Sequence, residues 1–313
     1  MLSRTANNLF WLARYMERAD NLARVIDVAS RLASLPSAFA GKSNEWEGAV
    51  ASASCRDEFF EVYKEATREN VIEFLVAHEA NPNSIRACID TARGNARAVR
   101  TAMTSEMWET INDVWLKMQN VKLKDIRDNK LNDFLSSIKE ASLRFDGAAN
   151  RTMLRTDHFY FERLGMFIER ADNTARLLDV KYHVLLPVDE PVGGGLDYFQ
   201  WTSLLRSVSA LTSFHWIYRE TVKPWLVADF LILRREQPRS LIAIYDSINQ
   251  QLNMLAELYG RQGPSQRNAR AIFANLQNAK IEDLFQNGLH EFISSFIVEN
   301  NKVGKSLAEQ YLL

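Results

Sequence analysis

Helix-breaking residues are scarce in this chain, which has 12 glycines and 7 prolines among its 313 residues. This scarcity leaves long stretches free to form uninterrupted helices. No run alternates polar and apolar residues for long enough to indicate a sheet. We therefore predict an all-α array of roughly ten or more helices.

Other absences exclude several classes of protein. Two cysteines, Cys55 and Cys88, are too few for a disulfide framework and form no CxxC pair. No stretch approaches the roughly twenty apolar residues needed to cross a membrane, and charged residues occupy the N-terminus where a signal peptide needs an apolar run. The net charge of −1, from 38 basic and 39 acidic residues, gives no electrostatic attraction for nucleic acid. We predict a cytoplasmic protein that binds neither membrane nor nucleic acid.

The residue patterns of common catalytic and cofactor sites are missing as well. The five histidines are scattered without a metal-binding spacing. There is no Ser-His-Asp order, reactive cysteine context or phosphate-binding glycine loop. The tryptophans, among them Trp11, Trp46, Trp108, Trp201 and Trp225, fall mostly in helical runs and are typical of a core. We predict no cofactor and no metal.

What the chain does contain is an internal repeat. Residues 12–28 and 164–180 are identical at ten of seventeen positions, where chance predicts about one identity. Fainter matches continue at offsets of 155 and 156 residues, among them Trp46 with Trp201, Tyr63 with Tyr218, Phe74 with Phe230, Pro82 with Pro238, and Ser84 with Ser240.

The repeat predicts the organisation of the chain. We expect a single domain over residues 1–313, with a first repeat of about residues 1–150 and a second of about 151–313. The two halves should be related by pseudo-twofold symmetry, with the two motif helices packed centrally. Ser84 and Ser240 each precede a long apolar-periodic run and are predicted helix N-caps. Loops are expected at residues 34–43 and 187–197.

Each repeat opens on a helix that carries the sequence Glu-Arg-Ala-Asp-Asn. Wound at about 100° per residue, residues 9–29 place apolar side chains on one side and charged side chains on the other. The charged face is the part that the two copies share. The candidate ligand-binding or polar network consists of the shared Arg18, Asp20, Asn21, Arg24 and Asp27 with Arg170, Asp172, Asn173, Arg176 and Asp179, together with Arg14 of the first copy, and Glu17 and Glu169 are candidate catalytic residues.

Some of these charges have partners on their own helix. Asp20 lies four residues before Arg24, and Asp172 four residues before Arg176, which is the favourable order for a helical ion pair. These four side chains can therefore pair locally.

The Glu-Arg dipeptides are different. Glu169, Arg170 and Arg18 have no opposite charge three or four residues away, and Glu17 has only Arg14. An unpaired charge is too costly to bury. We therefore predict that each glutamate forms an ion pair with an arginine of the other motif helix.

Two interpretations of this charged face stay open. It is either a structural network between helices or a site that binds a ligand or performs catalysis, because perturbed ionic clusters occur in both. In the second case the arginines would bind a carboxylate or phosphate, and a glutamate would act as acid or base. The arginines argue against a carboxylate-only metal site because they would repel a cation.

With these motifs the sequence resembles the Alpha-E family, a bacterial group of helical proteins named for its Glu-Arg (ER) motif. The resemblance covers nearly the whole chain, including residues 92–112, 228–241 and 288–292. One departure is Gly94, where the family usually has glutamate before Asn-Ala-Arg.

The resemblance also implies partners and a pathway. Members of the family are associated with circularly permuted ATP-grasp ligases and transglutaminase-like proteins. This association implies a component of a peptide or amide-bond metabolism system that binds a small anionic or peptide ligand at the central cluster. The alternative is a non-catalytic helical partner or scaffold for an ATP-grasp ligase, with a purely structural cluster.

Overall fold

The computed structural model describes residues 1–34, 45–126, 130–183, 194–286 and 288–312. Within these ranges all regular structure is helical and no strand is present, which confirms the predicted all-α class. Most of the predicted loops at 34–43 and 187–197 lies outside the described residues. Residues 195–197, predicted as loop, instead form the first turn of a helix, with Asp197 buried.

The described helices follow one another along the chain. Their bounds are α1 Ser3–Ala33, α2 Glu45–Ser52, α3 Arg56–Val62, α4 Arg68–Ala77, α5 Ile85–Ala98, α6 Ser105–Gln119, α7 Leu123–Asp125, α8 Leu131–Thr152, α9 Asp157–His183, α10 Gly195–Ser207, α11 Leu211–Tyr218, α12 Pro224–Ile232, α13 Leu241–Tyr259, α14 Pro264–Asn278, α15 Ile281–Gln286 and α16 Leu289–Leu307. A short 3₁₀ turn, Arg100–Ala102, precedes α6, and a π turn, Ala308–Leu312, follows α16.

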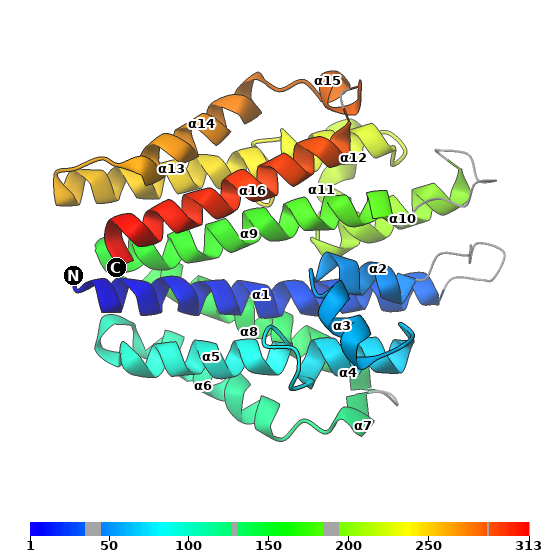
Figure 1. The fold of residues 1–313 in the computed structure, drawn as a ribbon, viewed down its shortest axis with the longest axis horizontal. Coiled ribbons are helices and arrows are strands. Elements are labelled where there is room, and N and C mark those ends of the chain that lie inside the picture. The colour runs from blue at the N-terminus through cyan, green and yellow to red at the C-terminus, as the bar shows by residue number, and fades with distance from the viewer. Residues whose placement is uncertain (35–44, 127–129, 184–193, 287, 313) are drawn as a thin grey trace.

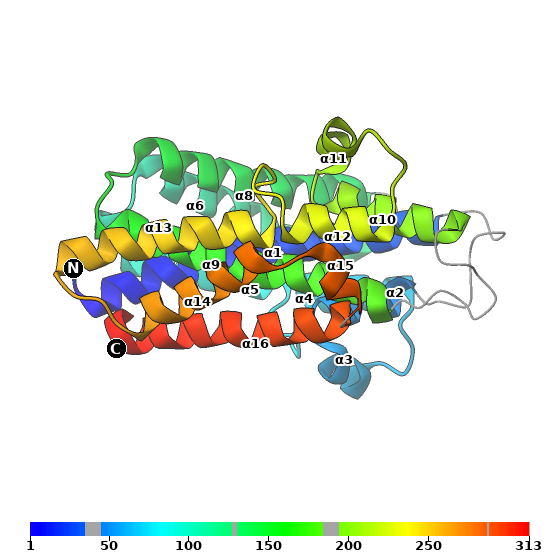
Figure 2. The same ribbon diagram turned by 90° about the horizontal axis from the view of Figure 1, so that it is seen from above.

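The two motif helices, α1 and α9, lie side by side in the middle of the array (Figure 1). The long helices α5 and α8 pack on α1, whereas α13 and α16 pack on α9. The same central pair can be followed from above in Figure 2. The charged motif therefore lies between layers of helices.

Serine side chains begin two of the flanking helices, as predicted. The hydroxyl oxygen of Ser84 accepts a hydrogen bond from the backbone N–H of Ala87 at 3.3 Å, at the start of α5. Ser240 does the same for Ala243 at 3.2 Å, at the start of α13. Each serine satisfies a backbone donor that has no partner inside the helix.

A glycine allows the central helices to approach closely. A Cβ atom on Gly165 of α9 would overlap the backbone carbonyl oxygen of Phe10 in α1. Phe10 itself is buried, which agrees with its apolar character on a face otherwise rich in charge. The absence of a side chain at residue 165 therefore sets the separation of the two motif helices.

The tryptophans divide between core and surface. Trp46 and Trp201 are buried, as predicted, and Trp11 and Trp108 are half-buried. Trp225 contradicts the prediction because 46% of it is exposed, and Trp216 is 73% exposed. Both lie on short helices at a corner of the array, where few neighbours can cover a large ring. Among the described residues, no helix has the length and apolar character that a membrane span requires.

Candidate functional site

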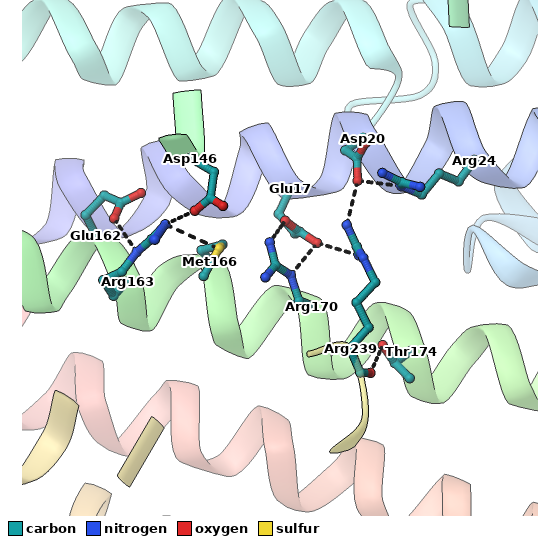
Figure 3. A network of polar contacts seen from close by, with 10 residues as sticks. All are labelled: Glu17, Asp20, Arg24, Asp146, Glu162, Arg163, Met166, Arg170, Thr174 and Arg239. Carbon is teal, nitrogen blue, oxygen red and sulfur yellow. Dashed lines mark hydrogen bonds and ion pairs between the residues drawn. The ribbon is translucent and has the colours of Figure 1, made fainter. Parts of the chain in front are cut away.

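Glu17 of α1 lies between two arginines that come from distant parts of the chain. Arg170 of α9 donates two hydrogen bonds to its carboxylate, Nε to Oε1 at 3.0 Å and Nη2 to Oε2 at 2.8 Å. Arg239, in the turn before α13, donates from Nη1 to Oε1 at 3.0 Å and from Nη2 to Asp20 at 3.1 Å. Figure 3 shows Arg239 between Glu17 and Asp20. Thr174 holds this turn in place by donating to the backbone carbonyl of Arg239 at 3.0 Å.

Glu169 of α9 has the reciprocal arrangement with α1. Arg18 donates from Nε to Oε1 at 2.6 Å and from Nη2 to Oε2 at 3.1 Å, and Arg14 donates from Nε to Oε2 at 2.8 Å. The predicted ion pairs between the motif helices are therefore confirmed. Arg14, the only base three or four residues from Glu17 on its own helix, instead pairs with Glu169 of the other helix.

The second arginine at each glutamate comes from a different place in the two halves. Arg14 aligns with Met166 in the repeat, at an offset of 152, and Arg239 aligns with Asn83, at an offset of 156. Asn83 accepts a hydrogen bond from Arg18 instead of contributing a charge. Each glutamate is thus paired with two arginines. The second arginine of Glu17 and the second arginine of Glu169 come from positions that do not align with each other.

The aspartates of the motif pair within their own helices, as predicted. Arg24 donates to Asp20 at 2.7 Å, and Arg176 donates to Asp172 at 2.6 Å. The remaining donors of these arginines cross between the halves. Arg24 donates to the backbone carbonyl of Ser207 and the hydroxyl of Ser209, and Arg176 donates to the hydroxyl of Ser54. Ser54 and Ser209 align in the repeat, and both have left-handed backbone conformations, with φ of 55° and 57°.

We call the residues joined in this way the central ionic cluster. It contains Arg14, Glu17, Arg18, Asp20, Arg24, Glu169, Arg170, Asp172, Arg176 and Arg239. Its six arginines exceed its four carboxylates, so the cluster has a formal excess of two positive charges.

Burial and neighbouring charge act in opposite directions on the glutamates. Burial would raise the pKa of Glu17, but Arg170, Arg239 and Arg24 outweigh it and lower the pKa to about 2. Burial also opposes ionisation of Glu169, and Arg14 and Arg18 again lower its pKa. Both side chains are therefore ionised at neutral pH.

This geometry restricts what the glutamates can do chemically. A carboxylate with a pKa of about 2 holds no proton to donate at neutral pH and is a weak base. Both oxygens of Glu17 and of Glu169 already accept hydrogen bonds from arginine. Both residues are almost completely buried, at 2% exposure each. The arrangement fits an inter-helix clamp better than a pair of acid–base residues.

Some polar atoms in the motif remain without a partner among the described residues. They are Oδ1 of Asp20, Oδ1 of Asp172 and Nδ2 of Asn173, all buried. Burial outweighs the attraction of Arg176 and raises the pKa of Asp172. An unpartnered buried donor or acceptor is costly, so these atoms are the places where a bound group would gain most.

Asp27 and Asp179, two other predicted site residues, form ion pairs with residues outside the cluster. Asp27 pairs with Arg31 at 2.9 Å and Lys139 at 3.1 Å. Asp179 pairs with His290 at 2.6 Å. Asn21 is half-buried. The shared charged face therefore divides into a central cluster and separate contacts further along the helices.

A third buried Glu-Arg pair, Glu162 with Arg163, was not predicted from the sequence. Arg163 of α9 donates to Glu162 at 2.9 Å and also to Asp146 of α8, as Figure 3 shows. Burial raises the pKa of Glu162, which Arg163 only partly offsets. The sequence contains an indication of this pair, because Glu162 and Arg163 repeat the Glu-Arg dipeptide seven residues, or two helical turns, before Glu169. For Arg239, the only indication in the sequence of a place in the site was its position between the aligned Pro238 and Ser240.

The fold and site define a class of all-helical protein whose two central helices are joined by reciprocal, buried glutamate–arginine pairs. Residues 1–312 match the Alpha-E family, described as a predicted alpha-helical domain with a conserved ER motif. The chain belongs to the Alpha-E family. No curated protein and no solved structure matches it.

Proposed function

We propose that this chain is a non-catalytic helical component of a bacterial system for peptide or amide-bond metabolism. In this proposal it acts in the cytoplasm and binds an ATP-grasp ligase and a transglutaminase-like protein. The pathway and the partners rest on the family association. The non-catalytic role rests on one observation, the complete occupation of Glu17 and Glu169 by arginines of the opposite helix.

The observation matters because catalysis needs a group that can exchange a proton or contact a substrate. Each glutamate instead holds a position between two guanidinium groups, at the centre of the helix array. Removing either charge would leave buried arginines uncompensated, which costs the folded state about 3–5 kcal/mol. The motif would then be retained because it aligns α1 with α9 and thereby shapes the outer surfaces that partners contact.

Co-expression tests the proposal. The chain is produced with an ATP-grasp ligase and a transglutaminase-like protein of the kinds associated with the family, and complexes are measured by size-exclusion chromatography with light scattering. We expect a complex with the ligase, and we expect Glu17→Gln and Glu169→Gln to lose melting temperature and complex formation together. Unchanged melting temperature with abolished pathway activity would contradict the structural role and point to a site.

A second candidate function is binding of a small ligand that carries both an anionic and an ammonium group, such as an amino acid or short peptide. It is favoured by the excess of two arginines and by the unpartnered Oδ1 atoms of Asp20 and Asp172. The arginines suit a carboxylate and the aspartate oxygens suit an ammonium group. Thermal unfolding with millimolar amino acids and dipeptides tests it, because a ligand that binds only the folded chain raises the melting temperature with its concentration. A melting temperature unaffected by any of them would reject this candidate.

We also propose that the two halves arose by duplication of one helical unit, with repeats of about residues 1–150 and 151–313 in a single domain. Equivalent ring contacts support it. Phe59 lies 5.2 Å from both Tyr63 and Phe74, measured between ring centroids. The aligned Phe214 lies 4.8 Å from Tyr218 and 5.6 Å from Phe230.

A further inference from the structure

Two short helical corners project from opposite sides of the molecule. The α3–α4 corner comprises residues 56–70, and the α11–α12 corner comprises the aligned residues 211–225, at an offset of 155. Figure 2 shows α3 and α11 standing out from the two sides of the helix array. The corners share an internal framework of aromatic rings, but their surfaces differ.

The α11–α12 corner exposes apolar and basic side chains. Trp216 is 73% exposed, Trp225 46% and Ile217 37%. Lys223 lies with its Nζ 5.5 Å from the ring centroid of Trp225 and pairs with Glu220 at 2.8 Å, and Arg219 is exposed at the end of α11. Exposed tryptophan beside a cationic side chain is typical of a protein-binding hot spot.

The α11–α12 corner is held in a fixed conformation. The Tyr218 hydroxyl donates to Asp229 of α12. Arg234 donates from Nε to Asp229 at 2.8 Å and to Tyr218 at 3.1 Å. These bonds tie the end of α11 to α12. The two tryptophans are therefore presented on a preorganised surface, which reduces the entropy lost on binding.

The α3–α4 corner has the opposite charge. Residues 56–70 contain five acidic and three basic side chains, a net charge of −2, whereas residues 211–225 contain one acidic and two basic side chains, a net charge of +1. At the positions aligned with Trp216 and Ile217, this corner has Glu61 and Val62. Val62 is 39% exposed, and Glu58, Glu61 and Glu65 are exposed around it. The exposed Val62 in a corner of net negative charge thus complements the exposed tryptophans in a corner of net positive charge.

We propose that the α11–α12 corner of one chain docks on the α3–α4 corner of a second copy of this chain. The contact is heterologous, because it joins two different surfaces. The corners project from opposite sides, so an assembly of any length keeps one free α11–α12 corner at one end and one free α3–α4 corner at the other. The chains therefore associate head to tail. The association is favoured at low ionic strength because salt screens the rim charges.

Blocked variants of the full chain test this inference. Trp216→Ala/Trp225→Ala removes the basic–aromatic surface, and Glu61→Lys/Glu65→Lys reverses the acidic surface. We expect the unmodified chain to associate as its concentration rises and as salt is lowered, as measured by sedimentation velocity. Each double variant should remain monomeric, with association weakened at least about tenfold.

Mixing the two variants gives the sharpest result. Each carries one intact corner, of the opposite kind, so an equimolar mixture should form a one-to-one dimer and stop there. A mixture that stays monomeric, or an unmodified chain that stays monomeric at all concentrations, would overturn the inference. So would a monomeric chain that sediments with phosphatidylglycerol vesicles through Trp216 and Trp225, because the surface would then bind lipid.

Controls separate docking from folding. Leu143→Ala, on the 63% exposed Leu143 of α8, should associate like the unmodified chain. If the tryptophan variant has an altered circular dichroism spectrum, Arg219→Glu/Lys223→Glu replaces it in the same experiment and should also be monomeric. None of these measurements involves the ATP-grasp ligase, so they leave the proposed function untouched.

Discussion

Glu17 and Arg170, which lie 153 residues apart in the chain, form a two-point ion pair between the two central helices. The guanidinium of Arg170 faces the carboxylate with two parallel hydrogen bonds, which is the strongest geometry available to this pair. The reciprocal pair of Glu169 with Arg18 has the same form. The motif helices are thus joined by two ion pairs, and in each pair one helix supplies the glutamate and the other supplies the arginine.

The first prediction concerns the strength of this clamp. Glu17→Gln should lower the free energy of unfolding by about 3–5 kcal/mol, because Arg170 and Arg239 stay buried without their counter-charge. Glu299→Gln is the matched control, since the pair with Lys302 is largely exposed and its loss should cost less than about 1 kcal/mol. Urea unfolding measures both. Equal, small losses would show that the buried pair does not hold the helices together.

The second prediction is the acid sensitivity of the same residue. The pKa of Glu17 in the folded chain is about 2, below its ordinary value of 4.5. Its ionised form therefore stabilises the fold above pH 4.5, and this contribution of about 3 kcal/mol is lost as the pH falls from 4.5 to about 2. The stability difference between the unmodified chain and Glu17→Gln should shrink over that range. Parallel stability curves would contradict the lowered pKa.

The third prediction has the opposite sign. The pKa of Glu162 is raised by burial, so the folded chain favours its neutral form. Its contribution to stability is present below the ordinary pKa of 4.5 and is lost as the pH rises above that value. Relative to Glu162→Gln, the unmodified chain should therefore become less stable as the pH rises from 4 towards 7. A difference that grows with pH would show that Arg163 dominates and that Glu162 is ionised like Glu17.

The fourth prediction tests the close approach of the central helices. Gly165→Ala should destabilise the fold by about 1–3 kcal/mol, because the new Cβ overlaps the backbone of Phe10 and must push α1 and α9 apart. Gly94→Ala is the matched control, since no atom lies within 4 Å of the new Cβ. In the exposed middle of α5 it should stabilise the fold by about 0.5–1 kcal/mol. Thermal unfolding of the two variants should therefore shift in opposite directions, and equal shifts would contradict the packing at Gly165.

Local rules determined a large part of this structure from the sequence alone. Scarce glycine and proline predicted the all-α class, and the apolar period predicted one buried face of α1, although the structure buries much of the charged face as well. Ser84 and Ser240 were predicted as N-caps, and Asp20 with Arg24 as a helical pair, because all of these depend on residues within one helical turn. The lack of local partners for Arg170 also predicted that its partner lies on another helix.

Only the tertiary structure decided which partners these charges have. Arg14 is within reach of Glu17 along its own helix, yet it pairs with Glu169. Gly165 brings α9 close enough to α1 for the arginine side chain to cross between the helices. Arg239 reaches Glu17 because the turn before α13 is bound to α9 through Thr174. Spacing along one helix specifies neighbours on that helix, whereas contacts between helices depend on their separation and relative register. No periodicity in the sequence encodes that separation or that register, and both follow from the packing of the whole array.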